Sequence, residues 1–181
     1  GGCAAGDFVI SGGELDISGG RSYVLGLNVE SNAVDPSIIV GGENFGSDGL
    51  NDIILKEIVL SYEAQPAQTL PTEERIPIYR LLRAGTSDES TLLINALGPL
   101  AQQQLMGSVL PGQTVTVFVT IKARGELGNK APVESNEMVF PIVVSNSGYD
   151  ASSRTCASGT LTDVNHPCGY LGQDHGPICR P

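Results

Sequence analysis

The sequence predicts an all-β protein, an antiparallel sandwich of the immunoglobulin-like or fibronectin-III-like type with a short helix and a disulfide-stapled, loop-rich C-terminal tail. Glycine (23) and proline (11) are abundant among the 181 residues, aromatic residues make up 5%, and tryptophan is absent. This composition is typical of short strands joined by turns. Several segments also alternate apolar and polar residues with the period of two of a half-buried strand. The Cys–Trp–Cys pattern of antibody domains is missing, so the prediction concerns architecture and not family.

The N-terminal segment is rich in glycine, and we expect residues 1–20 to form a flexible tether ahead of a sandwich domain over residues 21–146. The stretch from Asp7 to Ser18 nonetheless alternates enough apolar residues to complete the sheet of a neighbouring molecule by strand addition. The expected intermolecular contact involves Asp7, Val9, Ile10, Leu15 and Ile17.

The first strand of the sandwich is predicted from Arg21 to Val29, where apolar residues occupy every second position. A turn-rich stretch from Glu30 to Gly49 follows. The next strand runs from Ile53 to Tyr62. Its alternation breaks at Lys56, which indicates a β-bulge or an edge position near Lys56 and Glu57.

The segment from Ile76 to Leu82 is predicted to be an edge strand, because Pro77 cannot donate a ladder hydrogen bond. A short apolar run from Thr91 to Ile94 comes next. The residues from Leu97 to Met106 favour a helix, and Pro99 suits its first turn.

The strongest strand signal lies between Thr114 and Arg124, where alternation is longest and β-branched residues prevail. It predicts burial of Val115, Val117, Val119 and Ile121, with Thr116 and Thr120 more exposed. A hairpin-like connection over residues 125–132 leads to a closing strand from Met138 to Val144, in which Pro141 marks an edge or a bulge.

The tail over residues 147–181 holds three of the four cysteines and too few apolar residues to form a core of its own. Covalent staples are therefore expected. The four cysteines are Cys3, Cys156, Cys168 and Cys179, and two bridges among them allow three connectivities. We favour one bridge within the tail and one to Cys3.

Lipidation of Cys3 is the alternative to its pairing. Gly1-Gly2-Cys3, followed by Ala4-Ala5-Gly6, resembles the end of a bacterial lipoprotein signal. The two glycines ahead of Cys3 do not fit a processed lipoprotein, in which this cysteine would come first.

Two metal sites are conceivable, although we favour neither and expect no cofactor. A tetrahedral zinc ion accepts the set His166, Cys168, His175 and Cys179, but the gap between Cys168 and His175 is not that of a zinc knuckle. A calcium ion accepts oxygens such as those of Glu43, Asp48, Asn51 and Asp52, but the spacing is not that of an EF-hand and equally suits a plain turn.

Charge and motifs exclude several classes of function. The net charge is −10 and the basic residues are scattered, so nucleic acid is not expected as a partner. No apolar run approaches the ~20 residues of a membrane span. The sequence has no nucleophile elbow, phosphate-binding loop or zinc-protease motif, and we expect a protein that is not an enzyme.

Three stretches carry a resemblance to a known group of proteins. They are Asn51 to Glu63, Val133 to Ile142, and the tail Pro167 to Asp174 with Cys179. They resemble segments of uncharacterised predicted lipoproteins that are widespread in myxobacteria and related Gram-negative bacteria. The resemblance implies export, cysteine pairing in the tail and often a lipid anchor, and it transfers no catalytic residue.

These observations together predict a non-catalytic accessory or structural protein of the cell envelope, located in the periplasm, at the outer membrane or outside the cell. Its expected partners are other envelope proteins or further copies of itself, and it would touch the membrane only through a lipid on Cys3. The edges suspected of binding are Ile76 to Leu82 and Met138 to Val144. The alternative is a module that binds carbohydrate or mediates adhesion, which would require clustering among Tyr23, Tyr62, Tyr79, Tyr149 and Tyr170.

Overall fold

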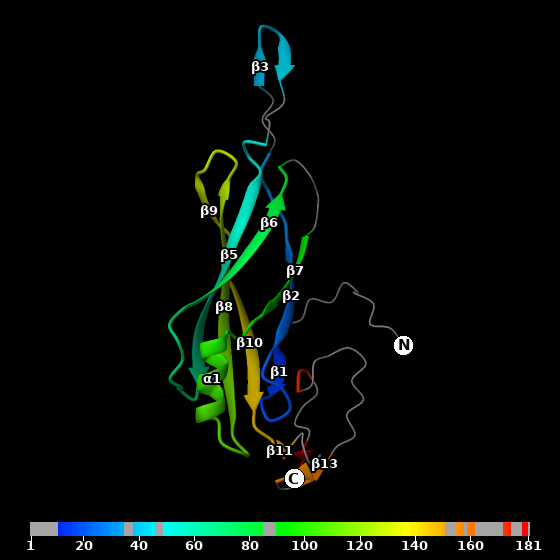
Figure 1. Ribbon diagram of the computed structural model, residues 1–181, viewed down its shortest axis with the longest axis vertical. Helices are drawn as coiled ribbons and strands as arrows, with labels where there is room; N and C mark the ends of the chain where they lie inside the picture. Colours follow the sequence, from blue (N-terminus) through cyan, green and yellow to red (C-terminus); the bar gives the residue numbers. More distant parts are fainter. Residues whose placement is uncertain are drawn as a thin grey trace, which may run out of the picture.

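The computed structural model describes residues 11–34, 38–45, 49–84, 90–150, 155–157, 159–161, 172–174 and 179–180. Strands dominate this part of the chain, and a single helix accompanies them there (Figure 1). The prediction of a β-rich fold with one short helix is confirmed.

The main sheet is mixed and curls into a half-barrel. Its strand order is β1 (Gly13–Asp16), β10 (Met138–Ser145), β8 (Thr114–Leu127), β5 (Ile53–Gln65) and β6 (Glu74–Leu82), and β9 (Pro132–Glu134) also pairs with β8. All pairings are antiparallel except that of β1 with β10, which is parallel. The predicted antiparallel sandwich is therefore wrong at this pairing, which makes the main sheet mixed.

A second ladder packs against the half-barrel. It pairs β2 (Val24–Val29) with β7 (Ser90–Asn95), and Figure 1 shows the two strands running side by side. Leu25 and Ile94 face the core, and the helix α1 (Pro99–Ser108) adds Ala101 and Leu105. Apolar residues from both layers and the helix therefore form one continuous core.

The alternation predicted for β8 is confirmed. Val115, Val117, Val119 and Ile121 are buried, whereas Thr116 and Thr120 are half-buried. The bulge is also confirmed, since the register of β5 shifts between Leu55 and Glu57 against both β6 and β8. The extra residue absorbs the break in alternation at Lys56, which is exposed.

The prolines lie at a sheet edge or in a first helical turn, as expected. β6, which contains Pro77, is an edge of the main sheet, and Pro99 occupies the first turn of α1. In β10, pairing with β1 begins only at Ile142, directly after Pro141. Among the described residues, the first half of β10 therefore has a neighbour on one side only, β8.

The remaining strands are short. β3 (Ile38–Val40) and β4 (Glu43–Phe45) form a hairpin whose turn residues Gly41 and Gly42 both have positive φ, a conformation that glycine adopts without strain. In the tail, β11 (Tyr149–Asp150) pairs with β12 (Thr155–Cys156), and β13 (Thr160–Leu161) pairs with β14 (Cys179–Arg180).

A disulfide between Cys156 and Cys179 joins β12 to β14, with the two Cα atoms 5.6 Å apart. The predicted bridge within the tail is confirmed. Cys3 and Cys168 lie outside the described residues, so the second bridge and the lipidation of Cys3 stay predictions.

The N-terminal segment departs most clearly from expectation. Leu15 is 0% exposed and Ile17 is 8% exposed, and β1 pairs with β10 of the same chain. The predicted tether over residues 1–20 is therefore wrong for residues 13–17. The tail lies along the other side of β1, where Leu15 forms a bridge with Gln173.

Candidate functional site

The tail segment Gly172 to Asp174 connects the two ladders. The Asp16 N–H donates to the Gly172 carbonyl at 2.8 Å, and the Asp174 N–H donates to the Glu14 carbonyl at 2.7 Å. On the opposite side, the Gln173 amide accepts from the Val24 N–H at 3.0 Å and donates to the Val24 carbonyl at 2.9 Å. The side-chain amide of Gln173 thus pairs with the Val24 backbone as a neighbouring strand would, and it connects β1 to β2.

Tyr23 anchors the same bridge from the core. It is 1% exposed, and its hydroxyl donates to both carboxylate oxygens of Asp174, at 2.9 and 3.1 Å. Burial, reinforced by the Asp174 carboxylate, raises the pKa of Tyr23 well above its usual value, so the phenol stays a donor. A Cβ at Gly13 would lie 2.0 Å from the Tyr23 hydroxyl oxygen, which explains the glycine in β1.

Asp16 lies at the end of β1 and is 1% exposed. Its carboxylate accepts from the Ser18 N–H and hydroxyl at 3.1 and 2.6 Å, and from the N–H and hydroxyl of Ser147. Burial alone would raise the pKa of Asp16, but the hydrogen bonds from Ser147 and Ser18 together hold it below its usual value. The carboxylate therefore serves to join the turn after β1 to the end of β10.

Glu74 caps the helix from a neighbouring strand. Its carboxylate accepts from the Leu100 and Ala101 N–H groups at 2.9 and 3.1 Å, and Tyr62 accepts from the Gly98 N–H at 2.9 Å. Gly98 has no side chain with which to cap the helix, and a Cβ there would lie 2.5 Å from the Glu74 carboxyl carbon. Burial raises the pKa of Tyr62. Both buried carboxylates of the described part, Asp16 and Glu74, thus hold the fold together.

A chain of ion pairs crosses the outer face of the main sheet. Arg75 contacts Glu73 and Glu57 at 2.7 and 3.7 Å, and Arg124 contacts Glu57 and Glu134 at 3.7 and 2.7 Å. Lys122 extends the chain to Glu134 and Glu137 at 3.4 and 2.8 Å. Because charges of both signs alternate, this face is not a patch for a charged ligand, and exposed pairs of this kind contribute little to stability.

Two of the strands that lie at the edge of a ladder, β6 and β7, differ in composition. β6 carries Arg75, Pro77 and Arg80, whereas β7 has neither a charged residue nor a proline. The most exposed large side chain of β7 is Leu93, at 73%. Charges and proline are the usual means of blocking unwanted pairing at an edge, so β6 is protected and β7 is not.

The backbone of β7 also offers open hydrogen-bonding positions. The Ala96 N–H, just beyond the strand, donates to the Tyr23 carbonyl at 2.8 Å. The N–H and carbonyl groups of successive residues point to opposite sides of an antiparallel strand. The even-numbered residues of β7 therefore direct these groups toward β2, and Thr91 and Leu93 direct them away from β2. No described strand pairs with that side of β7.

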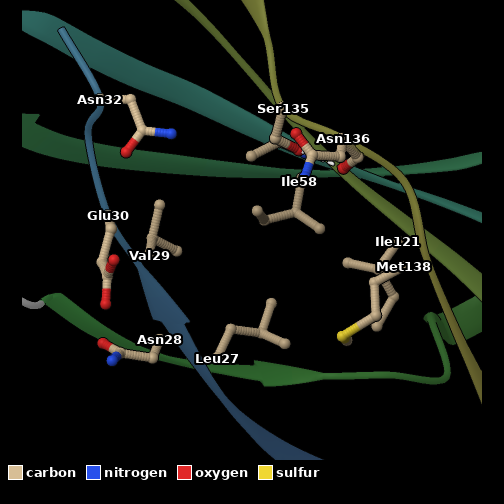
Figure 2. Close-up of a pocket in the computed structure, with 11 residues that line it drawn as sticks. Leu27, Asn28, Val29, Glu30, Asn32, Ile58, Ile121, Ser135, Asn136 and Met138 are labelled. Carbon is tan, nitrogen blue, oxygen red and sulfur yellow. Dashed lines mark hydrogen bonds between the residues drawn. The ribbon is translucent and has the colours of Figure 1, made fainter.

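A cavity of about 360 Å³ lies between β2 and the main sheet. Figure 2 shows Leu27 and Val29 of β2 directed into it, opposite Ile58, Ile121 and Met138. Its rim is polar and consists of Asn28, Glu30, Asn32, Ser135 and Asn136. We call this space the β2–β10 slot, because it opens where β10 begins and has not yet met β1.

The described residues include ligands from both metal sites that the sequence made conceivable. Cys179 is bonded to Cys156, so the zinc alternative, which was not favoured, lacks this ligand; His166, Cys168 and His175 lie outside the described residues. At the calcium set, Asp52 accepts from the Ala84 N–H at 2.9 Å, Asn51 donates to the Val34 carbonyl at 2.8 Å, and Glu43 lies in the β3–β4 hairpin. Asp48 is outside the described residues, and no three metal-binding side chains gather among those that the structure does describe.

The predicted contact residues do not gather at an accessible surface. Leu15 and Ile17 are buried in the core of their own chain, which makes their predicted role in an intermolecular contact wrong. Asp7, Val9 and Ile10 lie outside the described residues. The β7 edge is the feature that the sequence interpretation missed, although the uncharged run from Thr91 to Ile94 already contained its signal.

The described tyrosines do not form a platform for sugars. Tyr23 and Tyr62 are buried in the core, Tyr79 is 82% exposed on β6, and Tyr149 is half-buried in β11. Tyr170 lies outside the described residues. The clustering that the carbohydrate alternative requires is thus not found among the four described tyrosines.

Comparison with protein-family models, with curated proteins and with solved structures finds no match to this chain. Within the described residues, no helix has both the length and the apolar character needed to cross a membrane.

Proposed function

We propose that this protein is a non-catalytic binding protein that recruits an extended segment of another protein to the β7 edge by strand addition. The observation that carries the proposal is the open edge itself. Thr91 and Leu93 direct backbone donors and acceptors outward from a strand without charge or proline. An added strand would pair with these groups and cover the exposed Leu93 side chain.

The chemistry of the edge defines the partner. Backbone pairing accepts any extended segment, and specificity comes from the side chains that flank Leu93. Gly26 of β2 is paired with Leu93. Because Gly26 has no side chain, nothing from this position of β2 covers the Leu93 side chain. A partner strand with an apolar residue opposite Leu93 would therefore bind best.

The proposed location is the cell envelope or the exterior of the cell. The Cys156–Cys179 disulfide supports it, because such bonds persist in oxidising compartments. An immunoglobulin-like relationship of the fold, a lipid on Cys3 and partners among other envelope proteins belong to the same proposal. The two packed layers support the first of these.

Partner capture with two matched edge variants tests the proposal. Leu93→Lys places a charge on β7, and Tyr79→Lys places the same charge on the already protected β6. In-cell cross-linking followed by native purification should lose the captured partner with L93K and retain it with Y79K. Loss with Y79K alone, or retention with both variants, would contradict binding at β7.

A further inference from the structure

Two adjoining hollows lie around the turn that follows β1. The larger has a volume of about 570 Å³, and its lining includes that turn, Met106 of α1, Pro111 and Tyr149 of β11. The smaller has a volume of about 370 Å³ and runs along α1, where Gln102 and Met106 line it. Arg21 lines both hollows, as does Met106, so the two spaces meet at these side chains.

Hydrogen bonds within the fold hold the walls of these hollows. The Gly20 N–H donates to the Asp16 carbonyl at 3.0 Å, which fixes the turn that carries Arg21. The Asn146 side-chain amide donates to the Val109 carbonyl at 2.8 Å, which joins the chain just after β10 to the end of α1. Because the fold itself holds these walls, little ordering would oppose the binding of a ligand.

Arg21 gives the hollows their charge. Among the described residues that line them, only Arg21 is charged, and no described residue forms a hydrogen bond or an ion pair with its exposed side chain. Arg75 and Arg124, by comparison, each contact two carboxylates. In a chain with a net charge of −10, an arginine that no described acid neutralises favours an anionic ligand. Its planar guanidinium presents paired N–H donors that match the two oxygens of a carboxylate.

Apolar surface lines the larger hollow together with Arg21. Met106 is 41% exposed, and Tyr149 is half-buried. The Asn146 side chain also lines this hollow, but it already donates to the backbone after α1 and accepts from the Gly148 N–H at 3.1 Å. A ligand in the larger hollow would therefore meet apolar side chains and one cation.

We propose that the larger hollow binds a small monocarboxylate with an apolar body. The carboxylate lies against the Arg21 guanidinium, and the apolar body packs on Met106, Pro111 and Tyr149. The volume of about 570 Å³ is that of a small-molecule site, and the methionine side chain adapts to ligands of different shape. The site is independent of the proposed strand addition at β7.

The methyl resonances of the two methionines locate the binding site. Met106 lines the hollow and Met138 lines the β2–β10 slot, and each is 41% exposed, so Met138 is an internal control. Titration with octanoate should shift the Met106 methyl resonance and leave that of Met138 unchanged. No shift at Met106, or a shift at Met138 alone, would overturn the proposal.

Matched variants separate the contribution of charge from that of apolar contact. Arg21→Gln should weaken octanoate binding roughly threefold to fivefold, as for one exposed ion pair, and leave octanol binding unchanged. Lys130→Gln, which removes another exposed cation, should change neither affinity. Met106→Gln should weaken the binding of octanoate and octanol alike, whereas Met138→Gln should weaken neither.

Calorimetry measures these affinities on the full chain, and thermal melts check that each variant is folded. Octanoate should bind the native chain more tightly than octanol or octylamine, which have the same alkyl chain without the negative charge. Equal affinities for the three probes, or equal losses of octanoate binding in R21Q and K130Q, would overturn the proposal.

Discussion

β6 and β7 both lie at the edge of a ladder, but they differ in composition. β6 carries two arginines and a proline along an edge of the large sheet, and Arg75 is held by Glu73 and Glu57. β7 belongs to a ladder of two strands, and no described strand covers Leu93 or the two outward-facing backbone positions beside it. Among the described residues, features that block pairing are thus present at this edge of the larger sheet and missing from β7.

The two edges also differ in what holds them in place. β6 pairs with β5 along nearly its whole length, and β5 is paired in turn with β8. The ladder of β2 and β7 connects to the main sheet through hydrogen bonds from the tail, in which the Gln173 amide engages Val24. The open edge thus depends on a bridge from residues that come last in the chain.

Removing this bridge should have the largest effect on stability. Gln173→Ala deletes both hydrogen bonds to Val24 and leaves the half-buried N–H and carbonyl of Val24 without these partners, which should cost roughly 2–3 kcal/mol of unfolding free energy. Gln103→Ala, at an exposed helix position, is the matched control and should stay within about 0.5 kcal/mol. Chemical denaturation measures both, and equal stabilities would show that the ladder is held by packing alone.

A smaller effect on the free energy of unfolding is expected at Asp16, whose carboxylate joins the end of β1 to Ser18 and Ser147. Because its folded pKa lies below the unfolded value of about 3.9, its contribution is present above that pH and is lost as the pH falls through the folded pKa. Asp16→Asn should cost about 1–2 kcal/mol at pH 7. The difference from the native chain should shrink below about pH 4, as followed by thermal melts across pH. A difference that is constant with pH would mean that the charge of Asp16 is irrelevant.

The smallest effect on stability is expected at the protected edge. Pro77→Val with Arg80→Thr removes two blocking features from β6 and should leave the melting temperature nearly unchanged. The variant should instead self-associate as its concentration rises, measured by sedimentation velocity. A variant that stays as monodisperse as the native chain would show that these residues do not protect the edge.

Local sequence patterns predicted the strands, whereas the burial of β1 depends on contacts between residues far apart in the sequence. The alternation from Val115 to Ile121 and the break at Lys56 predicted a buried strand face and a bulge, because both depend on neighbours in sequence. The role of β1 could not be predicted in this way. Its burial depends on Gly172 to Asp174, which lie more than 150 residues away, as the contact of Glu14 with Asp174 at a separation of 160 illustrates.

The candidate binding edge at β7 could likewise be predicted only in part from the sequence. The uncharged composition from Thr91 to Ile94 is visible in the sequence, but the strand becomes an edge only because β2 is its sole described partner. The disulfide that the sequence favoured joins Cys179 to Cys156, so the sulfur of Cys179 is not free for the alternative zinc site. The spacing of the cysteines and histidines alone does not decide between a zinc site and a disulfide.

Amide exchange on the native complex, compared with the free chain, tests strand addition at β7 most directly. With the captured partner bound, the Thr91 and Leu93 amides should exchange at least roughly tenfold more slowly, while Tyr79 and Leu81 on β6 should be unaffected. Unchanged exchange at Thr91 and Leu93, or slowing confined to β6, would contradict the account.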